Sequence, residues 1–310
     1  MRVAAAQVRC PWMDREAGLR KVIDFVGRAA AAEVELVAFP ETFLPGYPIW
    51  LTQAEGARLD DAKQELAYAA YQEAAIELAG PELRTVVECV RDHGVFTYLG
   101  IAERGPGRGT VYCTLLAIDP VAGVCGVHRK LVPTFEERLV WGNGDGHGLQ
   151  VHQVGGARVG GLCCWENWMP LARHALYAQA PDLHVSVWPG STRLTGDITR
   201  FVALEGRVYS LAVGALIDYA DVPAGFPLRD EILAGGQISP YDGGSAIAGP
   251  DGRWIVEPVK DEERLVIADI DPTTVRGARQ VFDPTGHYSR PDVFQVTVNR
   301  RRLTSATFLD

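Results

Sequence analysis

The sequence predicts an α/β protein in which strands alternate with amphipathic helices. Short apolar runs of strand length recur along the chain, and between several of them apolar residues recur at helical spacing. Such helices bury one face only, so they are expected to pack on the outside of sheets. With 47% hydrophobic and 22% charged residues, the 310-residue chain has the composition of a globular protein with a sizeable core.

The expected elements follow this alternation in order. A first strand begins at Arg2, and apolar residues then recur at helical spacing between positions 19 and 30. Pro81 opens a second helix and Gly94 closes it, which is the usual placement of these residue types at helix ends. Further helices are expected at 171–179 and 197–207, and further strands at 34–39, 95–102, 111–119, 124–127, 151–154, 159–163, 183–187, 211–215, 245–248 and 265–270.

No linker, low-complexity run or repeat divides the chain, so residues 1–310 are expected to form a single domain. The formal charge of −9 disfavours binding to nucleic acid and to anionic membranes. The first residues do not show a charged-then-apolar stretch of signal-peptide length, so no leader is expected, and no apolar run reaches the ~18 residues that a membrane span needs. The six cysteines show neither CxxC pairs nor histidines at metal-binding spacing, which favours reduced thiols in the cytoplasm. The glycine-rich segments 105–109 and 142–146 lack the ending of a phosphate-binding loop, so no nucleotide cofactor is expected.

Cys164 stands where an apolar run, 159–164, meets a helix-like stretch. A thiol at such a strand-to-helix turn lies beside free backbone N–H groups, which can lower its pKa and hold an anion. A cysteine in an apolar run is most often a packing residue, and Cys163 fits that description. Because neighbouring side chains of a strand point to opposite faces, only one of the two thiols is expected to face a given pocket. Cys164, at the strand end, is the candidate nucleophile.

Two other apolar runs end in an ionisable residue in the same way. Glu41 directly follows one predicted strand, and Lys130 follows another. The sites of α/β proteins assemble at the carboxyl ends of strands. A carboxylate base, a cation and a thiol are together the groups needed for covalent attack on an electron-poor carbon. His128 is an alternative base for Cys164, although a lone histidine in a strand more often packs or hydrogen-bonds.

Three segments of the chain, in this order, resemble the signature segments of the nitrilase superfamily. They are 39–48 (FPETFLPGYP), 128–134 (HRKLVPT) with Glu137-Arg138 and Trp141-Gly142, and 164–170 (CWENWMP). The agreement extends to 203–207, 243–247 and 286–291, so that the likeness covers about residues 3–298. The Cys-Trp-Glu-Asn sequence resembles the nitrilase branch itself, because amidases, carbamoylases and ureidopropionases of the superfamily usually carry other residues after the cysteine.

The resemblance implies a nitrilase-like four-layer α-β-β-α sandwich that hydrolyses a nitrile to the carboxylic acid and ammonia, without metal or cofactor. Glu41 is then the base, Cys164 the nucleophile, and Lys130 the cation that stabilises developing negative charge. Glu137 matches the second glutamate of the family and is expected to position Lys130 or a water molecule, whereas Glu136 is expected to point to solvent. The implied partners are a small-molecule nitrile and further copies of the chain, in a homodimer or a larger homo-oligomer.

Aromatic residues in or beside these segments are candidate substrate-binding residues. Trp165, Trp188, Tyr47 and Trp141 are expected to line an apolar pocket, although tryptophan is also a common core residue. Such a pocket favours an aromatic or arylaliphatic nitrile over an aliphatic nitrile or cyanide.

Three alternatives remain open at this point. The same triad could hydrolyse an amide, or hydrate a nitrile or cyanide only as far as the amide, and product analysis would distinguish these reactions. A redox or thiol-transfer protein is a second class, but no resolving cysteine stands at CxxC spacing. A non-enzymatic binding protein on the same fold is the third, and the intact set of Glu41, Lys130 and Cys164 argues against it.

Overall fold

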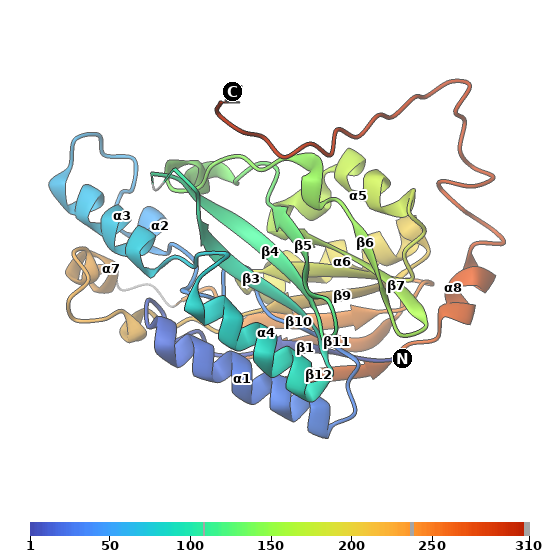
Figure 1. Ribbon diagram of the computed structural model, residues 1–310, viewed down its shortest axis with the longest axis horizontal. Coiled ribbons are helices and arrows are strands. Elements are labelled where there is room, and N and C mark those ends of the chain that lie inside the picture. The colour runs from blue at the N-terminus through green and yellow to red at the C-terminus, as the bar shows by residue number, and fades with distance from the viewer. Residues whose placement is uncertain (108, 236–238, 307–310) are drawn as a thin grey trace.

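Two β-sheets of six strands each form the centre of the protein (Figure 1). The computed structural model describes residues 1–107, 109–235 and 239–306, so that part of the glycine-rich segment 105–109 lies outside the described residues. Strands and helices alternate along most of the chain, as the apolar pattern predicts.

The first sheet contains the strands of the N-terminal half together with one strand from near the C-terminus. Its parallel centre arises because helical crossovers return the chain in the same direction, and its flanking strands pair antiparallel. The strand order is β12 (Arg264–Asp269), β1 (Arg2–Gln7), β2 (Leu36–Ala38), β3 (Phe96–Arg104), β4 (Val111–Asp119) and β5 (Gly123–Arg129).

The second sheet is formed by strands from the C-terminal half. Its centre is again parallel, with antiparallel strands at both edges. The strand order is β11 (Trp254–Lys260), β10 (Gly243–Ala248), β9 (Tyr209–Gly214), β8 (Leu183–Trp188), β7 (Ala157–Cys163) and β6 (Val151–Val154).

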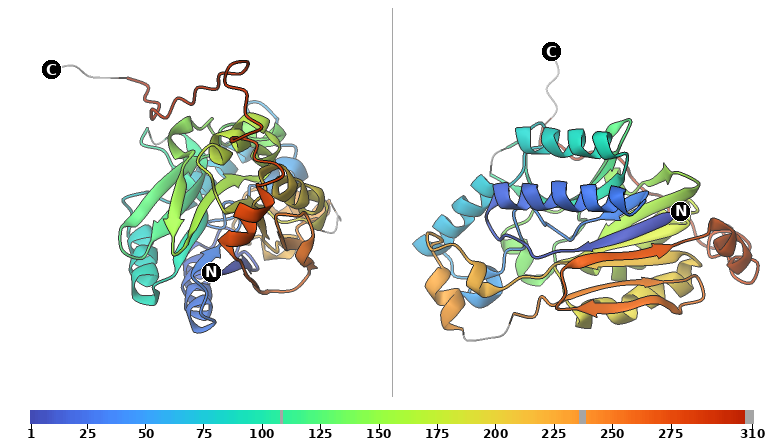
Figure 2. Two further views of the ribbon diagram at one scale, coloured as in Figure 1. Left: turned by 90° about the vertical axis from the view of Figure 1, so that its right-hand side faces the viewer. Right: turned by 90° about the horizontal axis from the view of Figure 1, so that it is seen from below.

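Helices cover the outer face of each sheet, which confirms the predicted four-layer sandwich (Figure 2). On the first sheet lie α1 (Arg15–Ala31) and α4 (Pro81–His93), which pack side by side. On the second lie α5 (Pro170–Tyr177) and α6 (Thr192–Gly206). The inner faces of the sheets pack against each other, and the Tyr98 hydroxyl crosses between them to donate to the Val159 carbonyl oxygen at 3.2 Å. Strands covered on both faces are largely apolar, and every residue of β8 is buried, including His184 and Ser186, which hydrogen-bond to Asn167.

The helix ends predicted from residue type are confirmed at α4. Pro81 is its first residue, and Gly94 follows it in the left-handed conformation with φ of 69°. Its N–H group donates to the carbonyl oxygen of Val90. By contrast, the helix expected at 197–207 begins earlier, at Thr192, with Ser191 in the N-cap position but without a side-chain capping bond.

Several elements were not apparent from the sequence pattern. Helix α3 (Ala62–Ala74) is rich in alanine, so its apolar periodicity is weak. Strand β11 contains Pro258, which is tolerated because the strand lies at the edge of the sheet. The other unpredicted elements are α2 (Trp50–Gln53), α7 (Arg229–Ala234), α8 (Pro272–Ala278) and the short 3-10 helices η1 (Phe135–Leu139), η2 (Gly146–Gly148), η3 (Cys164–Trp168) and η4 (Tyr219–Asp221). Within the described ranges, none of the helices has the length and apolar character required to cross a membrane.

Candidate active site

The three strand ends singled out in the sequence meet at one place between the two sheets. Strands β2 and β5 run in the same direction within the first sheet, and Glu41 and Lys130 follow their carboxyl ends. Strand β7 of the second sheet leads into Cys164. The Glu41 N–H donates to the carbonyl oxygen of Trp188 at 3.2 Å, and this bond ties the end of β2 to the end of β8 in the opposite sheet.

Lys130 lies at the centre of this cluster and is almost completely buried. Its Nζ donates to Oε1 of Glu41 at 2.9 Å and to Oε2 of Glu137 at 2.7 Å. The ring of Trp141 lies 5.5 Å from the same ammonium group. A buried ammonium is tolerable only when it is paired, and two carboxylates here provide that pairing.

Glu137 is held by a network of its own. Oε1 accepts a hydrogen bond from the Tyr47 hydroxyl at 2.9 Å, and Oε2 accepts one from the Thr134 N–H at 2.6 Å. Thr134 and Glu137 form a capping box at the start of η1, so the local sequence itself aims this carboxylate. The sequence predicted that Glu136 points to solvent, but the structure differs from this expectation. Glu136 is half-buried, and its Oε2 accepts from the Thr52 hydroxyl at 2.8 Å.

Cys164 is the first residue of η3 and has a positive φ of 49°, which is unfavourable for a residue with a side chain. Asn167 holds this conformation, since its Nδ2 donates to the Cys164 carbonyl oxygen at 2.8 Å. The Asn167 Oδ1 accepts in turn from His184 and Ser186 of β8. The backbone N–H of Trp165 acts to lower the pKa of the Cys164 thiol, as expected at a strand-to-helix turn.

Glu166 is a structural link that the sequence argument did not identify. Its Oε2 is 2.8 Å from Nε2 of His128 and accepts from the Cys163 N–H at 3.0 Å, while Oε1 accepts from the Leu131 N–H at 2.8 Å. One buried carboxylate thus joins the chain on both sides of Lys130 to the cysteine turn. His128 is therefore a hydrogen-bonding partner of Glu166. This agrees with the expectation that it packs or hydrogen-bonds, and it does not support His128 as a base for Cys164. The motif Cys-Trp-Glu-Asn contains the signal that could have identified Glu166.

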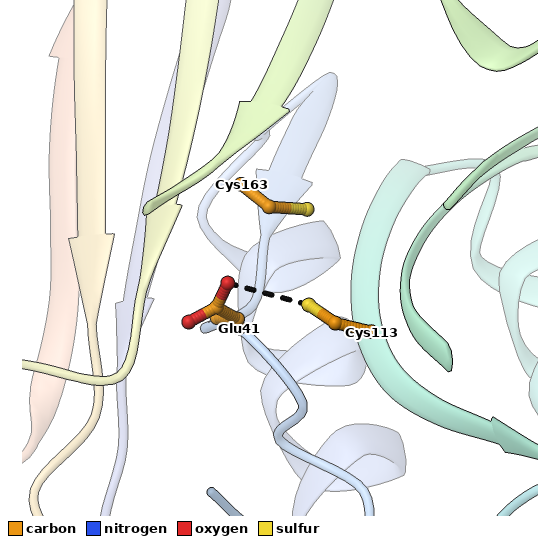
Figure 3. A group of neighbouring side chains, drawn as sticks. All are labelled: Glu41, Cys113 and Cys163. Atoms are coloured by element: carbon orange, nitrogen blue, oxygen red, sulfur yellow. Dashed lines mark hydrogen bonds between the residues drawn. The ribbon is translucent and has the colours of Figure 1, made fainter. Parts of the chain in front are cut away.

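Glu41 has thiols on more than one side (Figure 3). The Cys113 thiol donates to Glu41 Oε1 at 3.3 Å, and the thiols of Cys113 and Cys163 lie next to each other within 4.8 Å of that carboxylate. The Cys164 thiol also lies within 4.8 Å of Glu41. The sequence predicted that strand alternation would point the two thiols to opposite faces. This prediction does not apply, because Cys164 lies beyond the end of β7. Access separates them: Cys164 lines a cavity, whereas Cys163 is fully buried.

Burial dominates the titration of the cluster. It raises the pKa of Glu41 to about 7, although Lys130 acts in the opposite direction. Burial and the neighbouring Glu41 raise the pKa of the Cys164 thiol well above its usual value, so the Trp165 N–H does not produce the net lowering expected from the sequence. Burial alone would lower the pKa of Lys130, but Glu41, Cys164 and Glu137 outweigh it and raise that pKa well above the usual value. The resting cluster near neutral pH thus contains a neutral thiol, a charged ammonium and a carboxylate near its midpoint.

A cavity of about 180 Å³ opens onto the cluster. Cys164 and Glu137 face it, whereas Glu41 and Lys130 lie buried behind them. Tyr47 and Trp165 line the cavity as expected, but Trp141 and Trp188 are buried and are not among its lining residues. The remaining lining residues include Tyr241, Ser191, Arg193, Phe135, Leu51, Leu194, Pro48, Pro189 and Pro240.

Sequence reasoning missed the polar lining of this cavity. The ring of Tyr241 contacts that of Tyr47 in a tilted arrangement, with centroids 5.7 Å apart, and Tyr241 precedes the Gly243-Gly244 segment that the resemblance had marked. Ser191 and Arg193 belong to the start of α6, which had been expected farther along the chain. Serine is a preferred N-cap residue, so Ser191 was a signal in the sequence for a helix that starts at Thr192.

Two groups of side chains lie close enough together to share a metal ion: Glu41 with Cys113 and Cys163, and Glu41 with Glu137 and Cys164. In both groups, however, Glu41 already accepts a hydrogen bond from the Lys130 ammonium. A cation entering either group would have to bind beside that buried positive charge, which Coulomb repulsion opposes. The arrangement suits chemistry performed by the side chains themselves.

A thiol, a carboxylate and an ammonium are buried together between the two sheets of an α-β-β-α sandwich, an arrangement suited to covalent chemistry by a cysteine. Residues 2–280 match the carbon-nitrogen hydrolase family, and the chain belongs to that family. Within it, the protein is similar to nitrilases over nearly its whole length. It is 34% identical to an aliphatic nitrilase of Rhodococcus rhodochrous, over 98% of this chain and 84% of that protein. It is 33% identical to nitrilase 2 of Arabidopsis thaliana, over 100% of this chain and 91% of that protein.

Solved structures share the fold at lower sequence identity. The NitFhit protein of C. elegans matches with a TM-score of 0.72 and 17% identity, over 98% of this chain and 68% of that chain. The amidase from Nesterenkonia sp. AN1 matches with a TM-score of 0.63 and 21% identity, over 91% of this chain and 97% of that chain. These likenesses support the four-layer sandwich.

Proposed function

We propose that this protein hydrolyses an organic nitrile to the carboxylic acid and ammonia through a covalent intermediate on Cys164. The observation that carries the proposal is the juxtaposition of that thiol with two carboxylates within 4.8 Å, beside a cavity and in front of the buried Lys130 ammonium. The similarity to nitrilases over nearly the full length supports the nitrile as substrate.

In the first half of the proposed cycle, Glu41 accepts the thiol proton as the Cys164 sulfur bonds to the nitrile carbon. Its Oε1 already accepts from Lys130 and Cys113, whereas Oε2 has no partner among the described residues and is free to take the proton. The electron pair moves to the nitrile nitrogen, which is protonated to give a thioimidate. The Trp165 N–H and the Lys130 ammonium stabilise the negative charge, and one such donor typically contributes about 3–4 kcal/mol to barrier lowering.

In the second half, water adds to the thioimidate carbon and the carbon–nitrogen bond breaks to release ammonia. The remaining thioester is hydrolysed by a second water molecule, which regenerates the thiol. Glu41 removes and returns the protons, since a pKa near 7 lets one group act both as base and as acid at neutral pH. Glu137 positions Lys130 by its 2.7 Å hydrogen bond and faces the cavity from which water arrives.

The test is an assay of aliphatic, aromatic and arylacetic nitriles and of cyanide. The ammonia released and the ratio of acid to amide product are measured for each substrate. Stoichiometric ammonia and acid support the proposal, whereas amide as the sole product would identify a hydratase. Each nitrile is assayed beside its matching amide, so that faster turnover of the amide would identify an amidase. Cys164→Ala is the control for contaminating activity, and mass spectrometry should detect an adduct on Cys164 in the active enzyme only.

We further propose that residues 1–310 act as one cytoplasmic catalytic domain that assembles into a homodimer or a larger homo-oligomer. The six cysteines of the chain are free, which suits a reducing compartment. A shared hydrophobic core that includes residues from Val3 to Val275 supports a single unit. Light scattering coupled to size-exclusion chromatography measures the oligomeric state directly.

A further inference from the structure

The mouth of the candidate active-site cavity carries a cation with no partner. Arg193 lines the cavity, is exposed, and makes no ion pair or hydrogen bond within the described part of the chain. Arg9, by contrast, is also exposed but forms an ion pair with Asp221 at 2.7 Å. An unpaired guanidinium beside a substrate cavity is suited to bind an anion, because it presents several N–H donors in a fixed plane.

A second residue on the same side of the cavity, Ser191, is also suited to bind an anion. Ser191 is only 6% exposed and lines the cavity, yet its hydroxyl makes no capping bond to α6 and has no partner among the described residues. A hydroxyl that lines a cavity and has no partner in the protein is available to donate to an acceptor bound there. The same residue is the N-cap of a helix 15 residues long, whose N-terminus carries partial positive charge.

Each acidic group around the cavity is held by a neighbour other than Arg193. Glu137 shares its charge with Lys130 through the 2.7 Å ion pair. Glu136 also lines the cavity and keeps its negative charge, and its Oε2 is held by the Thr52 hydroxyl at 2.8 Å. Asp242 accepts from the Thr192 N–H at the start of α6, and its charge is paired with Lys260 at 3.4 Å. Arg193 therefore remains the one cavity-lining cation in the described residues that no acceptor neutralises.

We propose that the preferred substrates are nitriles that carry a carboxylate, with the nitrile carbon at Cys164 and the carboxylate bound by Arg193 and Ser191. The inference rests on the proposed nitrile hydrolysis and narrows its substrate class to cyano-carboxylic acids. The cavity of about 180 Å³ suits a short molecule of this kind. Arg193 and Ser191 are then specificity-determining residues, remote from the bond that is broken.

The test compares cyano-acids with two to five methylene groups between nitrile and carboxylate with their methyl esters, which have the same chain and no charge. We expect the ratio of kcat/KM for acid over ester to exceed one for at least one chain length. Arg193→Gln should lower that ratio about tenfold, equivalent to 1.4 kcal/mol, mainly through KM, while Arg193→Lys should retain part of it. Ser191→Ala should lower it less. Arg20→Gln, which removes an exposed arginine of α1 remote from the cavity, is the matched control.

Binding supplies a readout that does not depend on turnover. Calorimetry of 4-cyanobutanoate with Cys164→Ala should show binding that weakens about tenfold when Arg193→Gln is added, and that weakens with added salt, because an exposed cation is screened. Esters hydrolysed as well as acids, with a ratio unchanged by Arg193→Gln, would overturn the inference and leave nitrile hydrolysis standing. A preference for cationic nitriles would also overturn it, since Glu136 would then dominate the cavity. Absence of any nitrile turnover would overturn the proposed function and this inference together.

Discussion

The pH dependence of turnover is the most direct test of Glu41 as the base. Its carboxylate must be ionised to accept the thiol proton, and burial raises its pKa to about 7 from the usual 4.5. With that pKa, about a tenth of the molecules carry an ionised Glu41 at pH 6 and about a hundredth at pH 5. The rate constant kcat/KM should therefore fall about tenfold from its plateau to pH 6. A base with the usual pKa would lose only a few per cent there.

The thiol of Cys113 provides a way to shift this profile without touching the reacting groups. It donates a hydrogen bond to Glu41 Oε1, and such a bond favours the charged form of the carboxylate. Cys113→Ala removes the donor, so the acid limb should move to higher pH. Cys113→Ser substitutes a stronger donor, so the limb should move to lower pH. Cys89→Ala, at a buried thiol on α4 away from the site, should leave the profile unchanged.

The assay is steady-state kcat/KM with a nitrile that has no ionisable group, measured from pH 5 to pH 9 at constant ionic strength. Circular dichroism at each pH excludes unfolding as the cause of the decline. A flat profile between pH 5.5 and pH 8 would refute Glu41 as a base with a raised pKa. The role of the Cys113 hydrogen bond would be refuted if the Ala and Ser variants moved the limb in the same direction.

Three further predictions concern the residues around Glu41. Cys164→Ala should abolish hydrolysis while Cys163→Ala retains most of it, since only Cys164 lines the cavity; equal losses in a turnover assay would contradict the assignment. Lys130→Arg should fail nearly as badly as Lys130→Ala, because a forked guanidinium cannot replace an ammonium held between two carboxylates; recovery to within about tenfold of wild type, or 1.4 kcal/mol, would reduce Lys130 to a general positive charge. Glu137→Gln should lower kcat by orders of magnitude with the fold retained, and Glu136→Gln should change it far less; the reverse order would place the essential carboxylate at 136.

The local parts of this site were predictable because they depend on neighbours in the sequence. Apolar runs of strand length ended at Glu41, Lys130 and Cys164, and the structure contains strands ending just before each of them. The Thr134–Glu137 capping box is likewise a local device, which aims Glu137 through the backbone of η1. By contrast, the start of α6 was missed because its first turn carries few apolar residues, and with it the prediction missed Ser191.

The sequence by itself determined the alternation of strands with helices packed outside sheets, the strand ends that carry reactive side chains, and the candidate nucleophile, because periodicity and turn chemistry act over a few residues. The four-layer arrangement was implied by the family resemblance and not by periodicity. Only the tertiary structure decided how those ends meet. Packing of one sheet against the other brings Glu41 beside Cys164 and buries both, and burial is a property of the assembled layers that no local pattern contains. The raised pKa of Glu41, the protonated resting thiol, and the exclusion of Trp188 from the cavity all follow from that long-range packing.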